Sequence, residues 1–300
     1  MSQAPASAAA ADPQQAELVQ RAIKEISHIA TLPEVTLKII RLVEDPDSTA
    51  HDLNKVITND PALGARILKV VNSAFYGLPG QIGSINRAIV LLGLNAVKNI
   101  AIAASLAKLF RGGQIHPSFN ARDLWTHSIA VATGTRLLSK EIGLGLPDEA
   151  FLAGLIHDLG VMVEMQARRP QFVEMIEKLD QEPGTTLRAA ETAVIGANHE
   201  QFGAALCKAW KFPASFAYVT GFHHRPMELA QGHRTLTSLV HVADIITANR
   251  NMGYTRTVET DKPSEDVLDE LQLSQAKIDS VIEEMPQANE EAGALLNGGT

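Results

Sequence analysis

The sequence predicts an all-α fold. From about Glu17 onward, apolar residues recur at helical spacing, as in EVTLKIIRLVE, where Val35, Ile39, Leu42 and Val43 would share one face. No stretch alternates apolar and polar residues with a period of two for long enough to build a sheet. The chain is therefore expected to be a multi-helix protein.

Capping signals bound the N-terminal helices. Asp60 and Pro61 begin the helix in DPALGARILKVV, because Asp caps free backbone amides and Pro is pre-set for the first helical turn. Ser84 repeats this logic before INRAIVLLG, and Gly93 is expected to end that helix in a left-handed cap. Further helices are expected at about 95–110, 122–141, 147–166, 198–211, 213–222 and 234–250.

Changes in composition divide the chain into four parts. Residues 1–16 form an Ala/Pro/Gln-rich tail that is expected to be disordered. The Gly-containing connection RGGQIHPSFN at 111–120 separates an N-terminal helical subdomain, 17–118, from a second helical subdomain, 119–255. Residues 256–300 are expected to form an acidic, partly helical tail with short amphipathic pieces such as VLDEL and AKIDSVIEEM.

The charge pattern excludes some functions. The net charge of −8 lies entirely in residues 256–300, so the body of the protein is neutral and has no basic cluster for nucleic acid. We expect the tail to be a solvated helical appendage, with a docking segment for a basic partner as the alternative. No apolar run approaches the ~18 residues of a membrane span, and the first residues do not read as a secretory signal. With Cys207 as the only cysteine, a reducing cytoplasm is the expected compartment.

One apolar stretch in the second subdomain carries acidic and imidazole groups. The segment AFLAGLIHDLGVMVEM, residues 150–165, is apolar all round except for His157, Asp158 and Glu164, so it is expected to form a single buried helix. An uncompensated carboxylate at Asp158 would cost several kcal/mol. It should therefore be paired, protonated or bound to a metal.

Candidate partners for this dipeptide lie on other predicted helices. Residues His127 and Asp244 share helix faces with apolar residues, His199 follows a turn at Gly196, and Gly203 one turn later allows close backbone approach. Imidazole and carboxylate groups that converge in a helical core suit Zn, Mn or Fe(II), with Mg less favoured. The candidate ligands of a divalent metal are His127, His157, Asp158, His199, His223, His224 and Asp244.

Simpler structural roles remain open for several of these residues. Taken alone, His127 could be a core residue with one hydrogen bond, and His223-His224 could be a solvated helix end. We expect His241 to pack or to orient Asp244, and His233 to lie on the surface. We assign no function to the remaining histidines, His28, His51 and His116.

The order His127, His157-Asp158, Asp244 resembles the HD superfamily of metal-dependent phosphohydrolases. The N-terminal half, LPEVTLKIIRLVEDPDSTAHDLNKVITNDPALGARILKVVNSAFYG and SINRAIVLLGLNAVKNIAIA, is similar to the HDOD domain, the HD-related output domain of bacterial signalling proteins. The resemblance covers roughly residues 20–250. Its specific marks are Asp60-Pro61, Asn72-Ser73, Leu92-Gly93, GLIHDLG, NHEQFGAAL, GFHHRP and LVHVADIITA.

The resemblance implies a multi-helix HDOD fold, with the N-terminal subdomain packed on an HD-like subdomain. His199, His223 and His224 resemble the additional ligands of the dinuclear HD-GYP cyclic-di-GMP phosphodiesterases. Two departures argue against cyclic-di-GMP hydrolysis: Val161 stands where those enzymes carry Lys, and Arg225-Pro226 where their Gly-Tyr-Pro signature would begin. Glu191 could be a further carboxylate counterpart, but we expect it on solvated helix surface.

Two function hypotheses follow. HDOD domains are generally regulatory modules, so the first is a signal-transduction module that binds a partner protein or a nucleotide second messenger and keeps an HD-type metal site. The alternative is a metal-dependent phosphohydrolase or phosphodiesterase in which Asp158 would take part in catalysis, with Arg225 and Arg122 as candidate phosphate contacts. The resemblance favours the non-enzymatic role.

Overall fold

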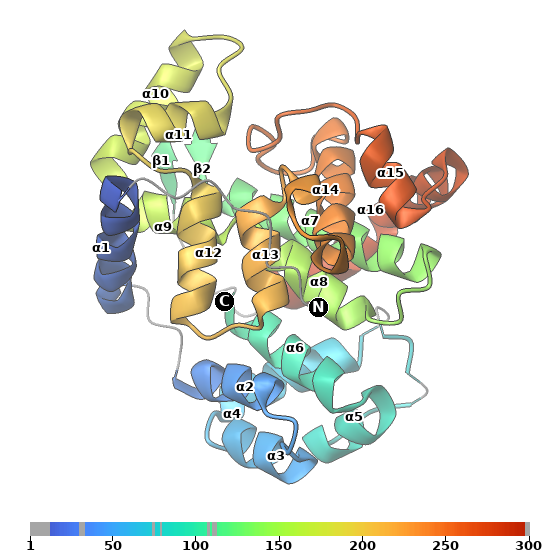
Figure 1. The fold of residues 1–300 in the computed structure, drawn as a ribbon. Helices are drawn as coiled ribbons and strands as arrows, with labels where there is room; N and C mark the ends of the chain where they lie inside the picture. The colour runs from blue at the N-terminus through green and yellow to red at the C-terminus, as the bar shows by residue number, and fades with distance from the viewer. Residues whose placement is uncertain are drawn as a thin grey trace, which may run out of the picture.

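The computed structural model describes residues 13–29, 34–73, 76–78, 80–106, 109 and 113–297, and over these residues the protein is almost entirely helical (Figure 1). This confirms the all-α prediction. The one departure is a small antiparallel hairpin of β1 (Gln114–His116) and β2 (Phe119–Asn120), which lies inside the expected connection at 111–120. Residues 1–12 of the expected tail lie outside the described residues, and helix α1 (Pro13–Ile29) begins earlier than Glu17.

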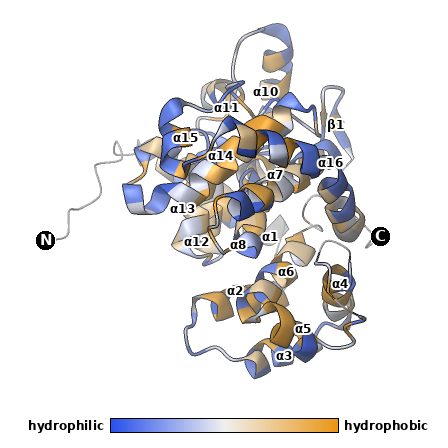
Figure 2. Cartoon of the chain, turned by 90° about the vertical axis from the view of Figure 1, so that its right-hand side faces the viewer, coloured by the Kyte–Doolittle hydropathy of each residue, from blue (hydrophilic) through white to orange (hydrophobic). Residues whose placement is uncertain are grey.

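Five helices form the N-terminal group, which lies below the rest of the molecule in Figure 2. The expected caps are present, because the side chain of Asp60 accepts a hydrogen bond from the Leu63 amide at 2.9 Å and Ser84 accepts one from the Arg87 amide at 3.2 Å. Gly93 ends its helix with a positive φ of 90° but an extended ψ of 158°. The helices are α2 (Glu34–Glu44), α3 (Ala50–Thr58), α4 (Pro61–Val71), α5 (Ile85–Leu92) and α6 (Leu94–Leu106).

Helix α6 joins this group to the second one. It packs against α2, α4 and α5 on one side and against α8 on the other, and it is buried from Ala96 to Leu106. Its one buried cation, Lys98, donates hydrogen bonds to the Leu42 carbonyl at 2.5 Å and to the Ser48 hydroxyl at 2.6 Å. Lys98 thereby satisfies a carbonyl at the end of α2, which helps to explain how a lysine is tolerated in this position.

The second group surrounds three central helices, α7, α8 and α14, which pack on one another. Helix α1 also belongs here in space, because it packs against α9 and α12 rather than against α2–α6 (Figure 1). The sequence reasoning did not predict α10 and α11. The elements are α7 (Ala121–Glu141), α8 (Pro147–Ile156), α9 (Leu159–Ala167), α10 (Arg169–Gln181), α11 (Leu187–Val194), α12 (His199–Ala209), α13 (Ala214–Phe222), the 3₁₀ turns η1 (Pro226–Glu228) and η2 (Gln231–His233), and α14 (Arg234–Asn249).

Glycines let the helices around the centre approach closely. A Cβ added at Gly154 of α8 would lie 2.7 Å from Ala132 Cα of α7, and one at Gly160 of α9 would lie 1.8 Å from the His199 carbonyl oxygen. Gly203 of α12 faces Thr220 of α13, where an added Cβ would lie 3.1 Å from the Thr220 Cβ, as the sequence predicted for a close approach. These contacts bring polar side chains of α7, of the α8–α9 junction, of α12 and of the end of α13 within reach of one another.

The C-terminal segment is packed on the core, which corrects the expectation of a solvated appendage. Its helices are α15 (Glu265–Leu271) and α16 (Gln275–Asn297), and α16 lies against α7. Val281, Met285 and Ala292 of α16 are each 1% exposed, and Met285 faces Gly134 of α7. The acidic residues of α16 lie on its outer face, while the apolar residues on its opposite face are buried. The net negative charge of residues 256–300 therefore does not mean that this segment is a solvated tail.

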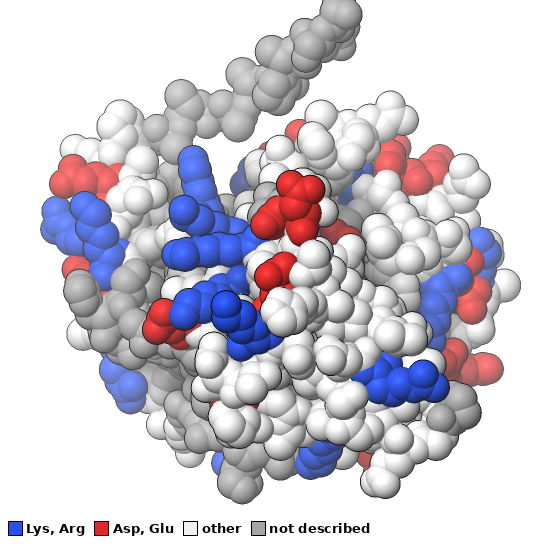
Figure 3. All heavy atoms as spheres, turned by 90° about the horizontal axis from the view of Figure 1, so that it is seen from below, with Lys and Arg blue, Asp and Glu red and all other residues white. Residues whose placement is uncertain are grey.

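The expectation that no apolar run approaches the length of a membrane span is wrong for one stretch of the described chain, Pro147–Ala167, which has that length and composition. However, 89% of its apolar window is buried inside the protein. It is therefore the core of the second group. The face in Figure 3, seen from below Figure 1, carries a group of Lys and Arg side chains with Asp and Glu directly beside it. Uncharged areas lie next to this group, and further charged side chains of both signs stand toward the edges of this face.

Candidate metal centre

The His157-Asp158 dipeptide lies at the junction between α8 and α9. The expected single helix over 150–165 is thus wrong at its centre, because α8 ends at Ile156 and α9 begins at Leu159. Ring Nδ1 of His157 donates to the Gly154 carbonyl at 2.7 Å, the carbonyl that a continuous helix would use for the Asp158 amide. The break turns both side chains into the space between α7, α12, α13 and α14.

All seven predicted ligands are brought together there. The seven residues form three groups that share members, and within each group the possible ligand atoms lie within 4.8 Å of one another. The groups are His127, His157 and Asp158; His157, His223 and Asp244; and His199, His223 and His224. Six of these seven residues are at most 2% exposed, and only His224 is partly open to solvent. The spacing predicted from sequence therefore corresponds to one buried constellation.

Asp158 stands between two sets of imidazoles. One carboxylate oxygen lies 3.2 Å from His157 Nε2, and the other lies 3.4 Å from His223 Nε2 and 3.7 Å from His199 Nε2. Both oxygens, together with Nε2 of His157 and of His223, are buried without a hydrogen-bond partner. Leaving such groups unsatisfied costs a few kcal/mol each, so this geometry fits coordination of a cation.

The imidazole rings are oriented by acceptors on their outer sides. A carbonyl oxygen can only accept a hydrogen bond, so His157 and His223 carry their proton on Nδ1, which faces Gly154 O at 2.7 Å and Val219 O at 3.2 Å. Each Nε2 therefore offers a lone pair toward Asp158 in the neutral ring. This is the arrangement in which backbone and carboxylate acceptors fix a ligand histidine for a metal.

His127 and Asp244 close the other side of the centre. His127 Nε2 lies 2.8 Å from Asp244 Oδ1, and the same oxygen lies 3.7 Å from His157 Nε2. Burial opposes a charged Asp244, but its hydrogen bond with His127 and the field of His157 lower the pKa of this carboxyl. A charged carboxylate shared by two imidazoles is a suitable donor for a divalent ion.

The carboxylates shift the protonation of the rings. Burial by itself lowers the pKa of His157, but Asp158 and Asp244 outweigh it and raise this pKa to about 9. In the same way, the carboxylates of Glu191 and, to a smaller extent, Asp158 outweigh the effect of burial and raise the pKa of His199 to about 9. His224 differs, because burial and the neighbouring His223 and His199 hold its pKa well below the usual range. Without a metal, protons on His157 and His199 would supply the positive charge that the site requires.

Glu191 is buried and does not lie on solvated helix surface, contrary to the sequence expectation. It is 0% exposed, and its two oxygens lie 2.9 and 2.8 Å from Nδ1 of His199. It also accepts the His199 backbone amide at 3.0 Å, so it fixes this ring from behind. Glu191 therefore orients the ring of His199, a predicted ligand.

Two further acids of the site were not predicted. Glu164 is 0% exposed, and its burial, together with the neighbouring Glu191 carboxylate, raises its pKa well above the usual range and so favours its protonated form. Glu200 is 0% exposed and accepts hydrogen bonds from Arg188 and Arg225. A signal existed for Glu164, which is the only carboxylate on the apolar stretch 159–167.

Other predicted residues take the places expected or lie outside the site. His241 Nδ1 lies 2.8 Å from the His223 carbonyl, so its hydrogen bond orients the His223 backbone rather than Asp244. His233 is exposed and lies against Tyr218. Arg225 is at the edge of the site, whereas Arg122 is exposed in the first turn of α7.

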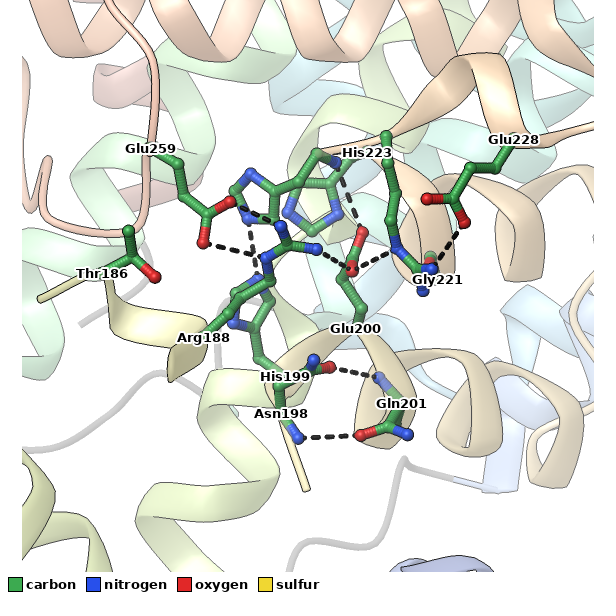
Figure 4. A network of polar contacts seen from close by, with 12 residues as sticks. Thr186, Arg188, Asn198, His199, Glu200, Gln201, Gly221, His223, Glu228 and Glu259 are labelled. Atoms are coloured by element: carbon green, nitrogen blue, oxygen red, sulfur yellow. Dashed lines mark hydrogen bonds and ion pairs between the residues drawn. The ribbon is translucent and has the colours of Figure 1, made fainter. Parts of the chain in front are cut away.

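Figure 4 shows how this edge is arranged, with the Arg188 guanidinium lying between Glu200 and Glu259 and directly above His199. Arg188 comes from α11, Glu200 from α12, and Glu259 from the loop after α14. Both arginines bind the same oxygen of Glu200, at 2.8 Å from Arg188 Nη1 and 3.0 Å from Arg225 Nε. The predicted ligands are therefore bordered by two guanidinium groups on the solvent side.

The fold and the site define an all-helical protein built around a buried His/Asp cluster of the kind that holds divalent metals. The HDOD domain family matches residues 29–226, more than half of the chain. The chain belongs to the HDOD family.

A known protein is similar to part of this chain. A relative, an uncharacterized protein of Treponema pallidum (strain Nichols), is 26% identical over 221 residues, which cover 73% of this chain and 42% of the relative. This chain thus spans less than half the length of that relative.

Solved structures share the fold at low sequence identity. An HDOD domain protein of unknown function from Geobacter sulfurreducens superposes with a TM-score of 0.79 at 22% identity and covers 94% of this chain and 98% of its own. A candidate signal transduction protein from Marinobacter aquaeolei VT8 gives 0.75 at 23%, over 95% and 65% of the two chains. A candidate phosphohydrolase from Shewanella amazonensis SB2B gives 0.70 at 22%, over 93% and 98%.

Proposed function

We propose that this protein is a regulatory module of bacterial signal transduction that binds a partner protein or a nucleotide and keeps an HD-type metal centre in its core. The metal centre is supported by four buried atoms that have no hydrogen-bond partner: both oxygens of Asp158 and Nε2 of His157 and of His223. If these residues served only to fill the core, apolar side chains of similar volume would do so without the desolvation cost of buried polar atoms. Family membership supports the signalling role.

The donor set points to a class of metal. Five imidazoles and two carboxylates are the predicted ligands, and this mixture favours Fe, Mn or Zn over Mg, which prefers oxygen ligands. His127, His157, Asp158 and Asp244 would hold one ion. His199, His223 and His224 would hold a second on the other side of Asp158.

Elemental analysis of protein purified without chelators tests this proposal. We expect stoichiometric metal in the parent protein and its loss in the double variant His157→Ala/Asp158→Ala, with a far-ultraviolet circular dichroism spectrum that stays helical. The pair His51→Ala/Asp52→Ala in α3, of which His51 is exposed and Asp52 half-buried, lies in the N-terminal group away from the centre and is the control that should keep the metal. A parent protein without metal would reduce the centre to a packing feature and overturn this part of the proposal.

The signalling role requires its own test. Deletion of the gene, compared with complementation by the parent and by the double variant, should change motility, surface behaviour or a second-messenger response. Unchanged behaviour in all of these assays would contradict a regulatory function.

A second candidate function is a metal-dependent phosphohydrolase, favoured by one observation. The second set of imidazoles, with the partly exposed His224, gives the centre more ligands than one ion needs and an edge toward solvent. Bound metal ions would supply a water of lowered pKa and polarise a phosphoryl oxygen. We would test this with bis(p-nitrophenyl) phosphate in the presence of Mn²⁺, Fe²⁺ or Mg²⁺. Turnover that is abolished in the double variant supports an enzyme, and no turnover in the metal-loaded parent excludes it for this substrate class.

A further inference from the structure

Two guanidinium groups are held side by side at the open edge of the metal centre. Glu200, which is 0% exposed, accepts Nη1 of Arg188 at 2.8 Å and Nε of Arg225 at 3.0 Å on a single carboxylate oxygen. The side chains of Arg188 and Arg225 are themselves 23% and 36% exposed. A buried acid therefore fixes both cations from the inside, while on the outer side Nη1 of Arg225 donates to Glu228 at 2.7 Å and Arg188 binds Glu259.

The same carboxylate connects these cations to the ligand set. Its other oxygen accepts the backbone amide of His224 at 3.3 Å, and Glu200 directly follows His199 in α12. Glu200 thus links the two guanidinium groups to His199 and His224, which are predicted ligands. Any anion that bridged the arginines would lie beside the one ligand, His224, that is partly open to solvent.

A carboxylate of this chain already occupies Arg188. Glu259, from the loop between α14 and α15, accepts two hydrogen bonds from it, from Nε at 2.9 Å and from Nη2 at 2.5 Å (Figure 4). This paired arrangement is the one in which arginine recognises carboxylate and phosphate alike. The loop is held at other points, because Tyr254 N donates to the Asp123 carbonyl at 3.0 Å and Arg256 binds Asp180.

We propose that Arg188 and Arg225 form a binding site for the phosphoryl group of a small ligand at the edge of the metal centre, and that Glu259 occupies this site as an internal competitor. The inference rests on the proposed function, because the site adjoins the same centre. A phosphoryl oxygen pair replaces the Glu259 carboxylate on Arg188 and releases residues 257–260 while the anchors at Tyr254 and Arg256 stay in place. The ligand class is a phosphate or phosphate ester, as free anion or as part of a nucleotide.

Inorganic phosphate and adenosine monophosphate are suitable probes for the full-length protein. We would titrate each by calorimetry into the protein as purified and after treatment with a chelator. Glu259→Gln should bind phosphate roughly tenfold more tightly, since a competitor that fills the site about nine-tenths of the time lowers the apparent affinity by that factor. Asp261→Asn, an exposed acid of the same loop, is the matched control and should leave the affinity unchanged.

Variants of Arg188 decide whether the arginine is the receptor. Arg188→Gln should abolish phosphate binding, and Arg188→Lys, which keeps the charge next to Glu200 but loses the paired geometry, should weaken it at least tenfold. Hydrogen exchange at residues 257–260 should accelerate in the parent when phosphate is added. Tighter binding of adenosine monophosphate than of phosphate would identify a nucleotide, and equal affinities would identify the free anion.

Phosphate binding tests the anion site, and metal content tests the metal centre, so the two proposals can fail separately. Phosphate binding that is the same in the parent, Arg188→Lys and Glu259→Gln overturns the anion site, even when elemental analysis finds metal. No phosphate binding in Glu259→Gln overturns it as well. Absence of metal together with binding that depends on Arg188 instead overturns the metal centre and keeps the anion site.

Discussion

His127 and Asp244, which are 117 residues apart in the sequence, meet in the buried core with 2.8 Å between Nε2 and Oδ1. Nδ1 of the same ring faces the Met252 carbonyl at 3.3 Å, so Nε2 can contact the carboxylate only through a proton or a shared cation. Asp244→Asn keeps the shape and removes the charge. We expect at least a tenfold loss of bound metal, since even groups that only support ligands change metal affinity about 10- to 100-fold.

Metal content measured by mass spectrometry at several metal concentrations checks this expectation. Asp180→Asn is the control, because Asp180 is a partly exposed acid that binds Arg256 away from the centre. Equal metal content in Asp244→Asn and in the parent would remove Asp244 from the ligand set.

Close packing at Gly160 supplies the second prediction. A Cβ there would lie 1.8 Å from the His199 carbonyl oxygen and 2.5 Å from the carbonyl carbon, so α9 and α12 would have to separate. We expect Gly160→Ala to lower the free energy of unfolding by about 3 kcal/mol or more, the range of severe overpacking, and to lower metal content with it. At Gly232 nothing lies within 4 Å of an added Cβ. Gly232→Ala should therefore unfold at a denaturant concentration close to that of the parent, and similar midpoints for the two variants would contradict the packing argument.

The third prediction concerns α16, which the sequence pattern placed outside the core. Met285 is 1% exposed and faces Gly134 of α7. Met285→Ala should destabilise the protein by about 2–5 kcal/mol, as removal of a buried side chain usually does. Glu283→Ala, on the exposed face of the same helix, should change stability by no more than about 0.5 kcal/mol. If chemical denaturation gave the same midpoint for both, α16 would be a loosely attached appendage.

The sequence was sufficient for the helical class, for several caps and for the seven side chains that meet in the buried cluster. Helical periodicity and capping depend on neighbouring residues, as at Asp60, and the ligand residues are of types that are seldom buried without a reason. The break at His157-Asp158 was not predicted, because it depends on a side chain that binds a backbone carbonyl, and apolar periodicity does not report such a contact.

Charge alone misled the interpretation in two places. Glu191 looked like surface in LRAAETAV, but a buried imidazole from the next helix is its partner. The acidic residues of α16 looked like a solvated tail, whereas the opposite face of that helix is packed on α7. In both cases the deciding interaction joins separate helices, and helical periodicity within one segment contains no information about it.

The last prediction concerns the pH dependence of stability through Glu164. Burial and the neighbouring Glu191 raise the pKa of this acid well above its ordinary value of 4.5, so the folded state holds a proton that the unfolded chain gives up at lower pH. The contribution of Glu164 to stability is therefore fully present below about pH 4.5 and is lost as the pH rises toward the folded-state pKa. Glu164→Gln keeps the size and shape of the side chain but cannot ionise. We expect the difference in unfolding free energy between Glu164→Gln and the parent to grow in favour of the variant from pH 5 to pH 8.5, as measured by urea denaturation with a chelator present.

His157 and His199, whose pKa values are each about 9, lose their own contribution to stability in both proteins over this range, so their contributions cancel in the difference. Glu177→Gln, on the exposed face of α10, should track the parent at every pH. A constant difference between Glu164→Gln and the parent across this range would show that Glu164 is ionised in the folded protein.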